Sequence, residues 1–219
     1  MLKEKILRYA ALYTRKQVSD IDIAGGDIVL VSNNEKLVSL EELAVDTLYH
    51  TEHAEHLTAE ATAQVKSNAF SLGCAFAEVE VDIPLGFIRL LEFVNCHDCG
   101  RLINPKTAEG QVHGGMSMAI GFGMFEQMLY DPKTGKLLNG NLLDYKLPTI
   151  LDHPRLEALF VENPEPTNPF GTKALGEPPA VPGAAAIRNA VLHATGIAIN
   201  SIPLSPHRLF AEFRNAGLV

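Results

Sequence analysis

The sequence lacks any long apolar run. No stretch of about 18 consecutive apolar residues occurs, so we expect no transmembrane helix. The N-terminal segment MLKEKILRYAALYTRKQ has neither a long apolar core nor a small-residue cleavage site. A cleavable signal peptide has both features, so we expect none in this segment.

The sequence also contains few positively charged residues. Lysine and arginine together number 18, against 26 aspartates and glutamates, which leaves a formal net charge of −8. Surfaces that bind nucleic acids or anionic membranes are usually basic. We therefore expect neither a nucleic-acid partner nor a membrane partner.

Cysteine is scarce as well, with only Cys74, Cys96 and Cys99 in the chain. An odd and low count favours a reducing cytoplasm over a disulfide framework. Cys96 and Cys99 form a CxxC pattern that we place in a strand-to-helix turn, but a structural zinc site needs four ligands and no second pair stands at a suitable spacing. We interpret the thiols as buried or incidental, with a zinc or redox site as the alternative.

The sequence does contain enough apolar material for a globular core. Hydrophobic residues make up 47% of the 219 residues, and this length fits one domain or two small ones. Apolar periodicity, capping residues and turn residues predict helices and strands in alternation. The predicted helices cover 3–17, a stretch from 40, 105–130, 183–195 and a stretch from 206, and the predicted strands cover a hairpin over 21–31, a hairpin over 75–94, 156–162 and 197–202. This mixture predicts the α+β fold class.

The predicted helix over 105–130 is rich in glycine. Each glycine inside a helix costs about 0.5–1 kcal/mol relative to alanine, so five of them need a reason. Close approach of another backbone or of a ligand is the usual reason, and the neighbouring Gln111 offers amide donors and an acceptor to a ligand. The alternative is a tightly packed buried helix with a polar anchor. The glycines are Gly110, Gly114, Gly115, Gly121 and Gly123.

A proline-rich loop over 163–182 contains Glu177 between Gly176 and the pair Pro178-Pro179. Prolines fix the backbone, so this carboxylate points in a defined direction. A rigidly held carboxylate in an apolar loop is suited to act as a general base, because desolvation raises its proton affinity. The alternative is an ordinary acidic residue in a solvated loop.

A third cluster, HTEHAEH over 50–56, holds three histidines and two glutamates within seven residues. Such residues can bind a metal at helical spacing. The flanking sequence over 50–68 has little periodicity, so we interpret it as a polar loop, with a metal site as the alternative.

Six short motifs occur in one order along the second half of the chain. They are EVEVD at 78–82, GRLINP at 100–105, EGQVHGG at 109–115, YKLPT at 145–149, GTK at 171–173 and LGEPP at 175–179. This order resembles the C-terminal part of the molybdenum-binding subunit of molybdenum hydroxylases, the xanthine dehydrogenase and aldehyde oxidoreductase family, and is most similar to the bacterial xanthine dehydrogenase subunits. The strong match covers 75–210. We therefore divide the chain into 75–219, a C-terminal molybdopterin-binding subdomain, and 1–74, a helix and hairpin part of the same region.

The resemblance implies a role for each matching residue. Glu177 is expected to be the catalytic base, which deprotonates a molybdenum-bound hydroxide before it attacks an electron-poor carbon. Gln111 is expected to hydrogen-bond molybdopterin near the metal. Gly114 and Gly115 are expected to let the helix approach the cofactor or pack beneath it, and Gly176 to place backbone beside the metal. No residue of the chain is expected to coordinate the metal directly. The implied reaction is hydroxylation of a purine or related N-heterocycle with water.

The family's other functional parts have no counterpart in these motifs. The arginine that orients the substrate, a second active-site glutamate and the aromatic pair around the substrate lie upstream in the family. Three cysteines cannot supply two [2Fe–2S] clusters of four ligands each. We therefore expect a cytoplasmic oxidoreductase of several chains, inactive from this chain alone.

The expected partners are the remaining portion of the molybdenum subunit, an iron–sulfur subunit and an FAD subunit. The cofactor is expected to be molybdopterin in its plain or nucleotide-linked form. We also expect an exposed apolar surface where the remaining portion docks. The alternative is a non-catalytic remnant or assembly domain with no cofactor of its own.

Overall fold

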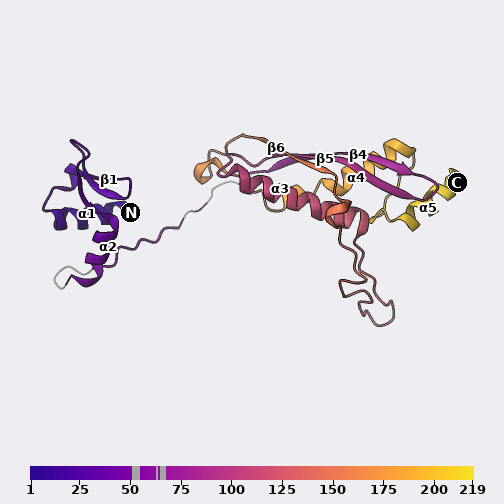
Figure 1. The fold of residues 1–219 in the computed structure, drawn as a ribbon, viewed down its shortest axis with the longest axis horizontal. Helices are drawn as coiled ribbons and strands as arrows, with labels where there is room; N and C mark the ends of the chain where they lie inside the picture. Colours follow the sequence, from indigo (N-terminus) through magenta and orange to yellow (C-terminus); the bar gives the residue numbers. More distant parts are fainter. Residues whose placement is uncertain (51–54, 63, 65–67) are drawn as a thin grey trace. The chain divides into compact units, whose positions relative to one another are not determined.

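The computed structural model describes residues 1–50, 55–62, 64 and 68–219 (Figure 1). The chain forms two compact units, Met1–Gln64 and Val65–Val219, and each is described by itself. The structural boundary precedes the first strand of the second unit, whereas the sequence-based division after residue 74 falls within that strand. In the described ranges, no helix combines the length and the apolar character needed to span a membrane.

The first unit is a small antiparallel sheet with two helices. Helix α1 (Leu2–Thr14) is followed by the short 3₁₀ turn η1 (Val18–Asp20), strands β1 (Ile21–Ala24), β2 (Asp27–Leu30) and β3 (Lys36–Ser39), and helix α2 (Leu40–Tyr49), with the strands in the order β1-β2-β3. The side chain of Ser39 accepts a hydrogen bond from the Glu42 backbone N–H at 3.1 Å and caps α2, so the prediction that this helix starts at residue 40 is confirmed.

A buried tyrosine joins the two helices of the first unit. Tyr9 is 4% exposed and packs in an apolar cluster with Ile21, Ile28 and Leu43. Its hydroxyl donates a 2.7 Å hydrogen bond to Asp46 Oδ2 on α2. Burial, together with this hydrogen bond, raises the pKa of Tyr9 to about 12.

The second unit is built on a three-stranded mixed sheet in the order β4-β5-β6. Strands β4 (Leu72–Asp82) and β5 (Phe87–Asp98) form the predicted hairpin and pair antiparallel, while β6 (Arg155–Val161) pairs with β5 in parallel. Parallel neighbours need a crossover connection. Helix α3 (Pro105–Ile120) lies within this connection and runs along the sheet, as Figure 1 shows.

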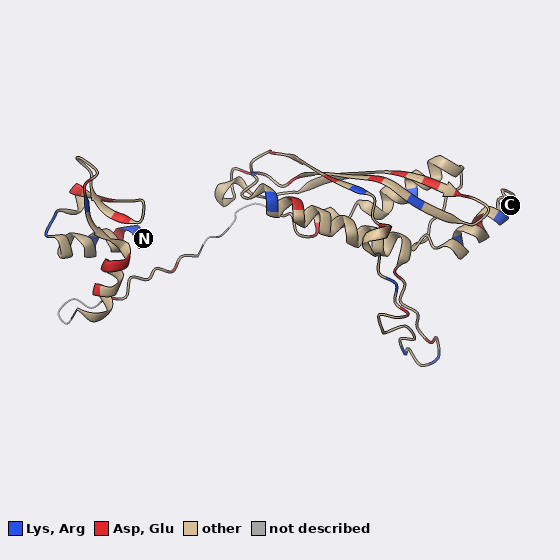
Figure 2. Ribbon diagram, viewed as in Figure 1, with Lys and Arg blue, Asp and Glu red and all other residues tan. Residues whose placement is uncertain are grey.

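One face of this sheet is buried and the other is open. Ile88, Leu90 and Phe93 of β5 are buried against the helices, and the core continues through Val112 and Met116 of α3. Side chains on the opposite face are solvated, and acidic and basic residues are interspersed along the elements (Figure 2). The alternation along β5 therefore fixes which face the helices cover.

Helix α3 starts as predicted but ends earlier. Asn104 caps it by accepting a hydrogen bond from the Thr107 N–H, and Pro105 occupies its first turn. The helix passes into a π-helical turn, η2 (Gly121–Phe125), and the backbone is extended at Glu126. The prediction that the helix reaches residue 130 is therefore wrong, because the chain leaves the helix axis after η2 to form an arm.

This arm, residues 126–149, projects away from the sheet and helices (Figure 1). The side chain of Asn139 accepts from Leu129 N–H and donates to the Gln127 carbonyl, so it holds the two sides of the arm together. The arm returns through the 3₁₀ turn η3 (Ile150–Asp152). There the imidazole of His153 hydrogen-bonds the Ser117 hydroxyl of α3 at 2.8 Å.

The C-terminal region covers the core with two further helices. These are α4 (Gly183–Thr195), which ends at Gly196 with φ of 76°, and α5 (Pro206–Asn215). The predicted strand over 197–202 is wrong. The carbonyl of Ile199 accepts a 2.7 Å hydrogen bond from the Arg188 side chain instead of a strand partner, so this segment follows α4 rather than the sheet.

Candidate functional site

The candidate site forms where α3 meets the loop that contains Glu177. Gln111 Nε2 on α3 donates a 2.9 Å hydrogen bond to the carbonyl of Gly176. Gly176 immediately precedes Glu177, which leads into the 3₁₀ turn η5 (Pro178–Ala180). Two segments that lie 65 residues apart in the sequence are thus joined at a single contact.

A buried amide holds the far side of Glu177. Asn95 on β5 has no exposed surface, and its Nδ2 donates a 2.8 Å hydrogen bond to the carbonyl of Pro179. A Cβ atom at Gly115 would lie 2.5 Å from Pro179 Cβ, so only glycine lets η5 pack this closely on α3. Glu177 therefore sits between two carbonyls that side chains of α3 and β5 fix in place.

A partly buried ion pair fastens the start of the same loop. Lys173 Nζ lies 2.7 Å from Asp98 Oδ2, with the two side chains only 7% and 11% exposed. Burial by itself raises the pKa of Asp98, but hydrogen bonds from Lys173 and from the Gly100 N–H outweigh it and lower the pKa. The Lys173 backbone N–H also donates to the Cys99 carbonyl at 2.8 Å. The loop is therefore tied to the end of β5.

Two neighbouring hollows open on either side of the Gln111–Gly176 contact. One, of about 740 Å³, is lined by Ser71, Leu72, Gly73, Ala174, Gly176, Glu177, Pro178, Val181 and Pro182. The other, of about 400 Å³, is lined by Gln111 together with residues of the GRLINP and GTK segments. The side chains of Gln111 and Glu177 are both exposed. Both residues are therefore available to a ligand that spans the two hollows.

The glycines of the site fall into two kinds. A Cβ at Gly110, Gly114 or Gly176 would meet nothing within 4 Å, so the backbone there faces open space. A Cβ at Gly115 would collide with Pro179, so this glycine serves packing within the fold. The two adjacent glycines of the EGQVHGG motif thus have different roles. Gly114 leaves the surface of α3 without a side chain, and Gly115 allows η5 to pack closely on α3.

Of the two candidates for metal binding, the structure bears on the CxxC pattern. Cys96 lies within β5 and Cys99 just beyond its end, so the prediction that the CxxC pattern occupies a turn is wrong: β5 runs four residues past the predicted hairpin end at residue 94. Over the described part of the chain, no group of three or more metal-ligating side chains exists. Of the HTEHAEH cluster, residues 51–54 lie outside the described residues.

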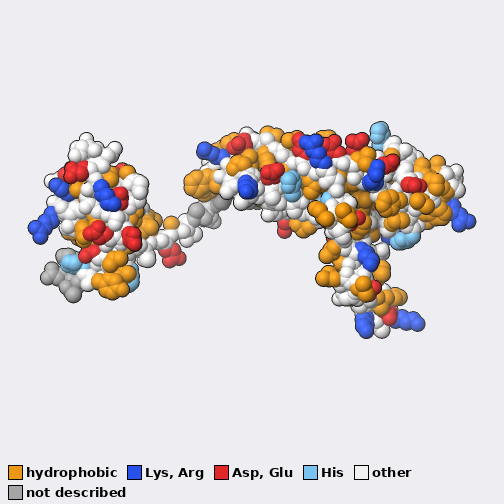
Figure 3. Space-filling view, viewed as in Figure 1, with side chains coloured by type: hydrophobic (Ala, Val, Ile, Leu, Met, Phe, Trp, Pro, Cys, Tyr) orange, Lys and Arg blue, Asp and Glu red, His pale blue; other side chains and the backbone are white. Residues whose placement is uncertain are grey.

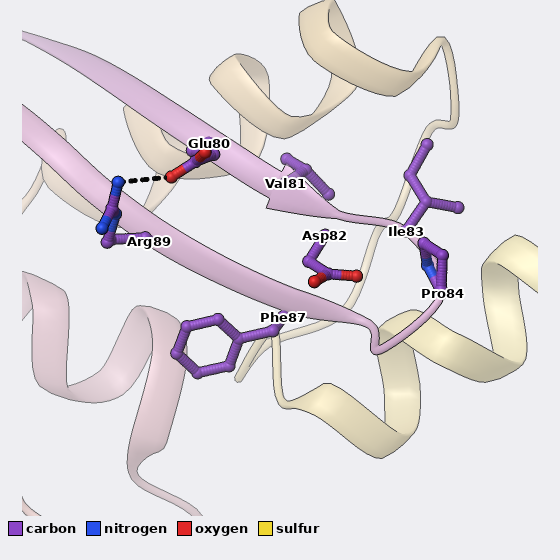
Figure 4. Close-up of a pocket in the computed structure, with 7 residues that line it drawn as sticks. All are labelled: Glu80, Val81, Asp82, Ile83, Pro84, Phe87 and Arg89. Carbon is purple, nitrogen blue, oxygen red and sulfur yellow. Dashed lines mark ion pairs between the residues drawn. The ribbon is translucent and has the colours of Figure 1, made fainter.

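A further hollow, of about 550 Å³, lies at the turn of the β4–β5 hairpin (Figure 4). Its charged residues Glu80 and Arg89 form a 2.6 Å ion pair with both side chains more than half exposed. None of the predicted site residues lines it. Because its charges already neutralise each other in solvent, we do not assign it a role.

Sequence reasoning missed Asn95, Asp98 and Lys173 as parts of the site. A signal for Asn95 did exist: it follows Phe93 at an inward position of an alternating strand, where an apolar residue is expected. A polar side chain at such a position needs a hydrogen-bond partner. The identity of that partner, 84 residues away, was not accessible from local sequence.

Together, these features define an α+β domain with an open surface, formed by the bare face of a helix and by a loop that carries an exposed carboxylate. The chain belongs to the molybdopterin cofactor-binding domain family, whose sequence profile matches residues 1–154. The predicted resemblance is thereby confirmed. Glu177 lies beyond the profile match, and its segment is covered by the full-length relatives instead.

Among curated relatives, the chain is 49% identical over its whole length to the putative xanthine dehydrogenase molybdenum-binding subunit of Escherichia coli K12. It is 29% identical over 95% of its length to the nicotine 6-hydroxylase large subunit of Paenarthrobacter nicotinovorans. The chain spans 29% and 26% of the lengths of these two proteins.

Solved structures agree with the predicted α+β class. Quinoline 2-oxidoreductase from Pseudomonas putida 86 matches 97% of the chain with a TM-score of 0.79 and 29% identity. The Cu,Mo-CO dehydrogenase matches 99% with a TM-score of 0.79 and 27% identity. Each match covers 28% of the solved chain.

Proposed function

We propose that this chain is the portion of a xanthine dehydrogenase-like molybdenum-binding subunit that supplies the catalytic base and part of the molybdopterin pocket. The observation that carries the proposal is the hydrogen bond from Gln111 to the Gly176 carbonyl. It brings the expected cofactor ligand and the residue next to the expected base into one place. Membership of a molybdopterin-binding family supports the interpretation of this contact as part of a cofactor pocket.

The residues present fit a large planar cofactor. The α3 backbone at Gly110 and Gly114 faces open space, so a ring system can lie against it without displacing a side chain. Gln111 donates a hydrogen bond from its Nε2 to the Gly176 carbonyl, and its exposed side chain lies next to this bare stretch of α3. Gly115 packs against Pro179, so α3 and the Glu177 loop are held in close contact next to this face.

Each residue then has a defined task in the reaction. When bound, the molybdenum cofactor would supply the redox centre for the two electrons that leave the substrate. A carboxylate oxygen of Glu177 accepts the proton from the attacking water-derived oxygen. Asn95, through Pro179, and Gln111, through Gly176, hold the backbone on both sides of Glu177, so the carboxylate keeps its direction.

For the substrate, we propose a purine or a related N-heterocycle. The names of three relatives support this class: xanthine dehydrogenase, nicotine 6-hydroxylase and quinoline 2-oxidoreductase. The chain would work in the cytoplasm with the remaining portion of the molybdenum subunit and with partner chains that hold [2Fe–2S] clusters and FAD. These partner cofactors provide the exit path for the electrons.

The exposed apolar side chains near the arm support docking of the remaining portion of the subunit. Leu142 and Leu143 in the arm are 82% and 80% exposed, and Ile150 and Leu151 at its base are 85% and 92% exposed. Figure 3 shows hydrophobic side chains along this projecting segment. Large apolar side chains gathered on one exposed segment usually mark an interface.

The test uses the chain co-expressed with a partner polypeptide that carries the remaining portion of the subunit, and with iron–sulfur and flavin subunits. Glu177→Gln should abolish turnover of an N-heterocycle while the molybdenum content stays near that of the unaltered complex. Glu165→Gln, in the same loop but bonded to Thr167, is the matched control and should remain active. Full activity of Glu177→Gln would overturn the assignment, and a complex that never retains molybdenum would favour the non-catalytic alternative.

A further inference from the structure

Two of the three cysteines face each other across the β4–β5 hairpin. Cys74 of β4 is paired directly with Cys96 of β5 in the antiparallel register. Directly opposed residues in such a ladder have Cα atoms about 4.5–5.5 Å apart, and a disulfide needs about 4.4–6.8 Å. The backbone already meets the distance that a cross-strand disulfide requires.

The two thiols are also in contact. Burial raises the pKa of Cys96, and the electrostatic interaction and hydrogen bond with the neighbouring Cys74 side chain raise this pKa further. Opposed residues project from the same face of the sheet, so no strand has to rotate for the sulfur atoms to bond. The two cysteines are therefore close in space as well as opposed in register.

Access differs among the three thiols. Cys74 is exposed and Cys96 is half-buried, whereas Cys99 is 4% exposed. An oxidant in solution therefore reaches Cys74 first, Cys96 stands beside it, and Cys99 is shielded.

We propose that Cys74 and Cys96 form an oxidisable dithiol that closes to a cross-strand disulfide and leaves Cys99 as a thiol. With a peroxide as oxidant, the Cys74 sulfur attacks one oxygen, the O–O bond breaks, and the first water leaves as a sulfenic acid forms. The Cys96 sulfur then attacks the Cys74 sulfur, the S–O bond breaks, and the Cys96 proton leaves with the second water. Two thiols and one peroxide give one disulfide and two waters, with two electrons passing from sulfur to oxygen.

The dithiol lies at the end of the hairpin that borders the candidate site. Gly73 and Leu72, next to Cys74, line the hollow that contains Glu177. Asn95, next to Cys96, holds the Pro179 carbonyl. A disulfide here would fix the start of β4 against β5, so the wall of that hollow would become less mobile on oxidation.

The experiment uses the purified 219-residue chain, fully reduced and then treated with hydrogen peroxide at a low molar excess. Intact mass should fall by two hydrogens, and peptide mapping should find Cys74 linked to Cys96. Alkylation of the folded protein should show loss of the Cys74 thiol at least about tenfold faster than loss of the Cys99 thiol. A disulfide that includes Cys99, a disulfide between two chains, or sulfinic acid at Cys74 with no disulfide would each overturn the proposal.

A variant with the same number of thiols provides the control. Cys74→Ser combined with Phe76→Cys moves the exposed thiol two residues along the same face, opposite Val94 and diagonal to Cys96. Diagonal neighbours are about 7–8 Å apart, beyond disulfide reach. This variant should form the internal disulfide at least about tenfold more slowly, and Cys99→Ser should form it at the unaltered rate. Equal rates in the shifted variant would show that register does not control the reaction, which contradicts the proposal.

Discussion

Asn95, in the middle strand of the sheet, donates a 2.8 Å hydrogen bond to the carbonyl of Pro179, two residues after Glu177. The donor side chain is fully buried, and its Oδ1 atom has no partner among the described residues. One buried N–H group from a distant strand therefore anchors the loop on the C-terminal side of the candidate base.

The first prediction replaces Asn95 by aspartate or by leucine. Asn95→Leu leaves the Pro179 carbonyl without its donor, which should cost about 1–3 kcal/mol in the free energy of unfolding. Asn95→Asp should cost more, because it sets a carboxylate against a carbonyl oxygen. Urea unfolding of each variant gives these values.

The two variants should also differ in their pH dependence. Burial raises the pKa of an introduced carboxyl, so the folded protein prefers the protonated form. The stability of Asn95→Asp should therefore fall as the pH rises from acidic to neutral, whereas the loss in Asn95→Leu should not change over this range. A pH-independent loss in Asn95→Asp would show that position 95 is more open to solvent than the structure has it.

The second prediction compares the adjacent glycines of α3. Gly114→Ala adds a methyl group that meets nothing within 4 Å, so it should stabilise the helix by about 0.5–1 kcal/mol. Gly115→Ala places the methyl group 2.5 Å from Pro179 Cβ and should destabilise the chain by about 1–3 kcal/mol. Thermal unfolding of both variants should move in opposite directions. A shared direction would contradict the close packing of η5 on α3.

The third prediction breaks the partly buried ion pair of Lys173 and Asp98. Lys173→Met leaves Asp98 without its cation and should cost about 2–3 kcal/mol, at or below the lower end of the range for fully buried pairs, because both side chains keep some solvent contact. Asp98→Asn with Lys173→Met should recover part of this loss. The matched control is Arg89→Met, which breaks the exposed pair with Glu80 and should change the unfolding free energy little.

This ion pair also sets a pH dependence. The folded-state pKa of Asp98 is lowered, so its contribution to stability is present above the unfolded-state pKa of the carboxyl and is lost as the pH falls through the lowered value. Lys173→Met should lose this part of the acid dependence. An unchanged acid-unfolding curve in Lys173→Met would argue against the pair as its source.

The sequence was sufficient for the elements that depend on local signals. The cap at Ser39, the first turn at Asn104 and Pro105, and the end of α4 at Gly196 are each set within a few residues, and the structure has all of them. The segment 197–202 shows where such signals fail. Its residues have strand propensity, but the Ile199 carbonyl bonds the Arg188 side chain, and that contact depends on tertiary packing.

The candidate site shows the same division. Gln111 and Glu177 each stood out from their local patterns, but the contact between Gln111 and Gly176 bridges 65 residues and follows from how α3 packs on the loop. The different environments of Gly114 and Gly115 also could not be read from the sequence, because the two residues are identical and adjacent. Local chemistry identified candidate residues, and only packing assigned them to open or closed surfaces.

The last prediction concerns Tyr9 in the first unit. Its pKa is raised to about 12, so the folded state holds the phenol proton more tightly than the unfolded chain, where tyrosine titrates near 10. The stability that follows is complete below the unfolded-state value and is lost as the pH rises from about 10 to about 12. Tyr9→Phe removes both the proton and the 2.7 Å hydrogen bond to Asp46.

Tyr9→Phe should therefore be less stable than the unaltered chain at neutral pH, and this difference should shrink as the pH rises through that window. Chemical unfolding at several pH values, followed by tyrosinate absorbance, measures both quantities. Tyr49→Phe is the control, since the Tyr49 side chain in the same unit is 79% exposed. If Tyr9→Phe and the unaltered chain differ by the same amount at every pH, the buried hydroxyl is not the source of the alkaline loss of stability.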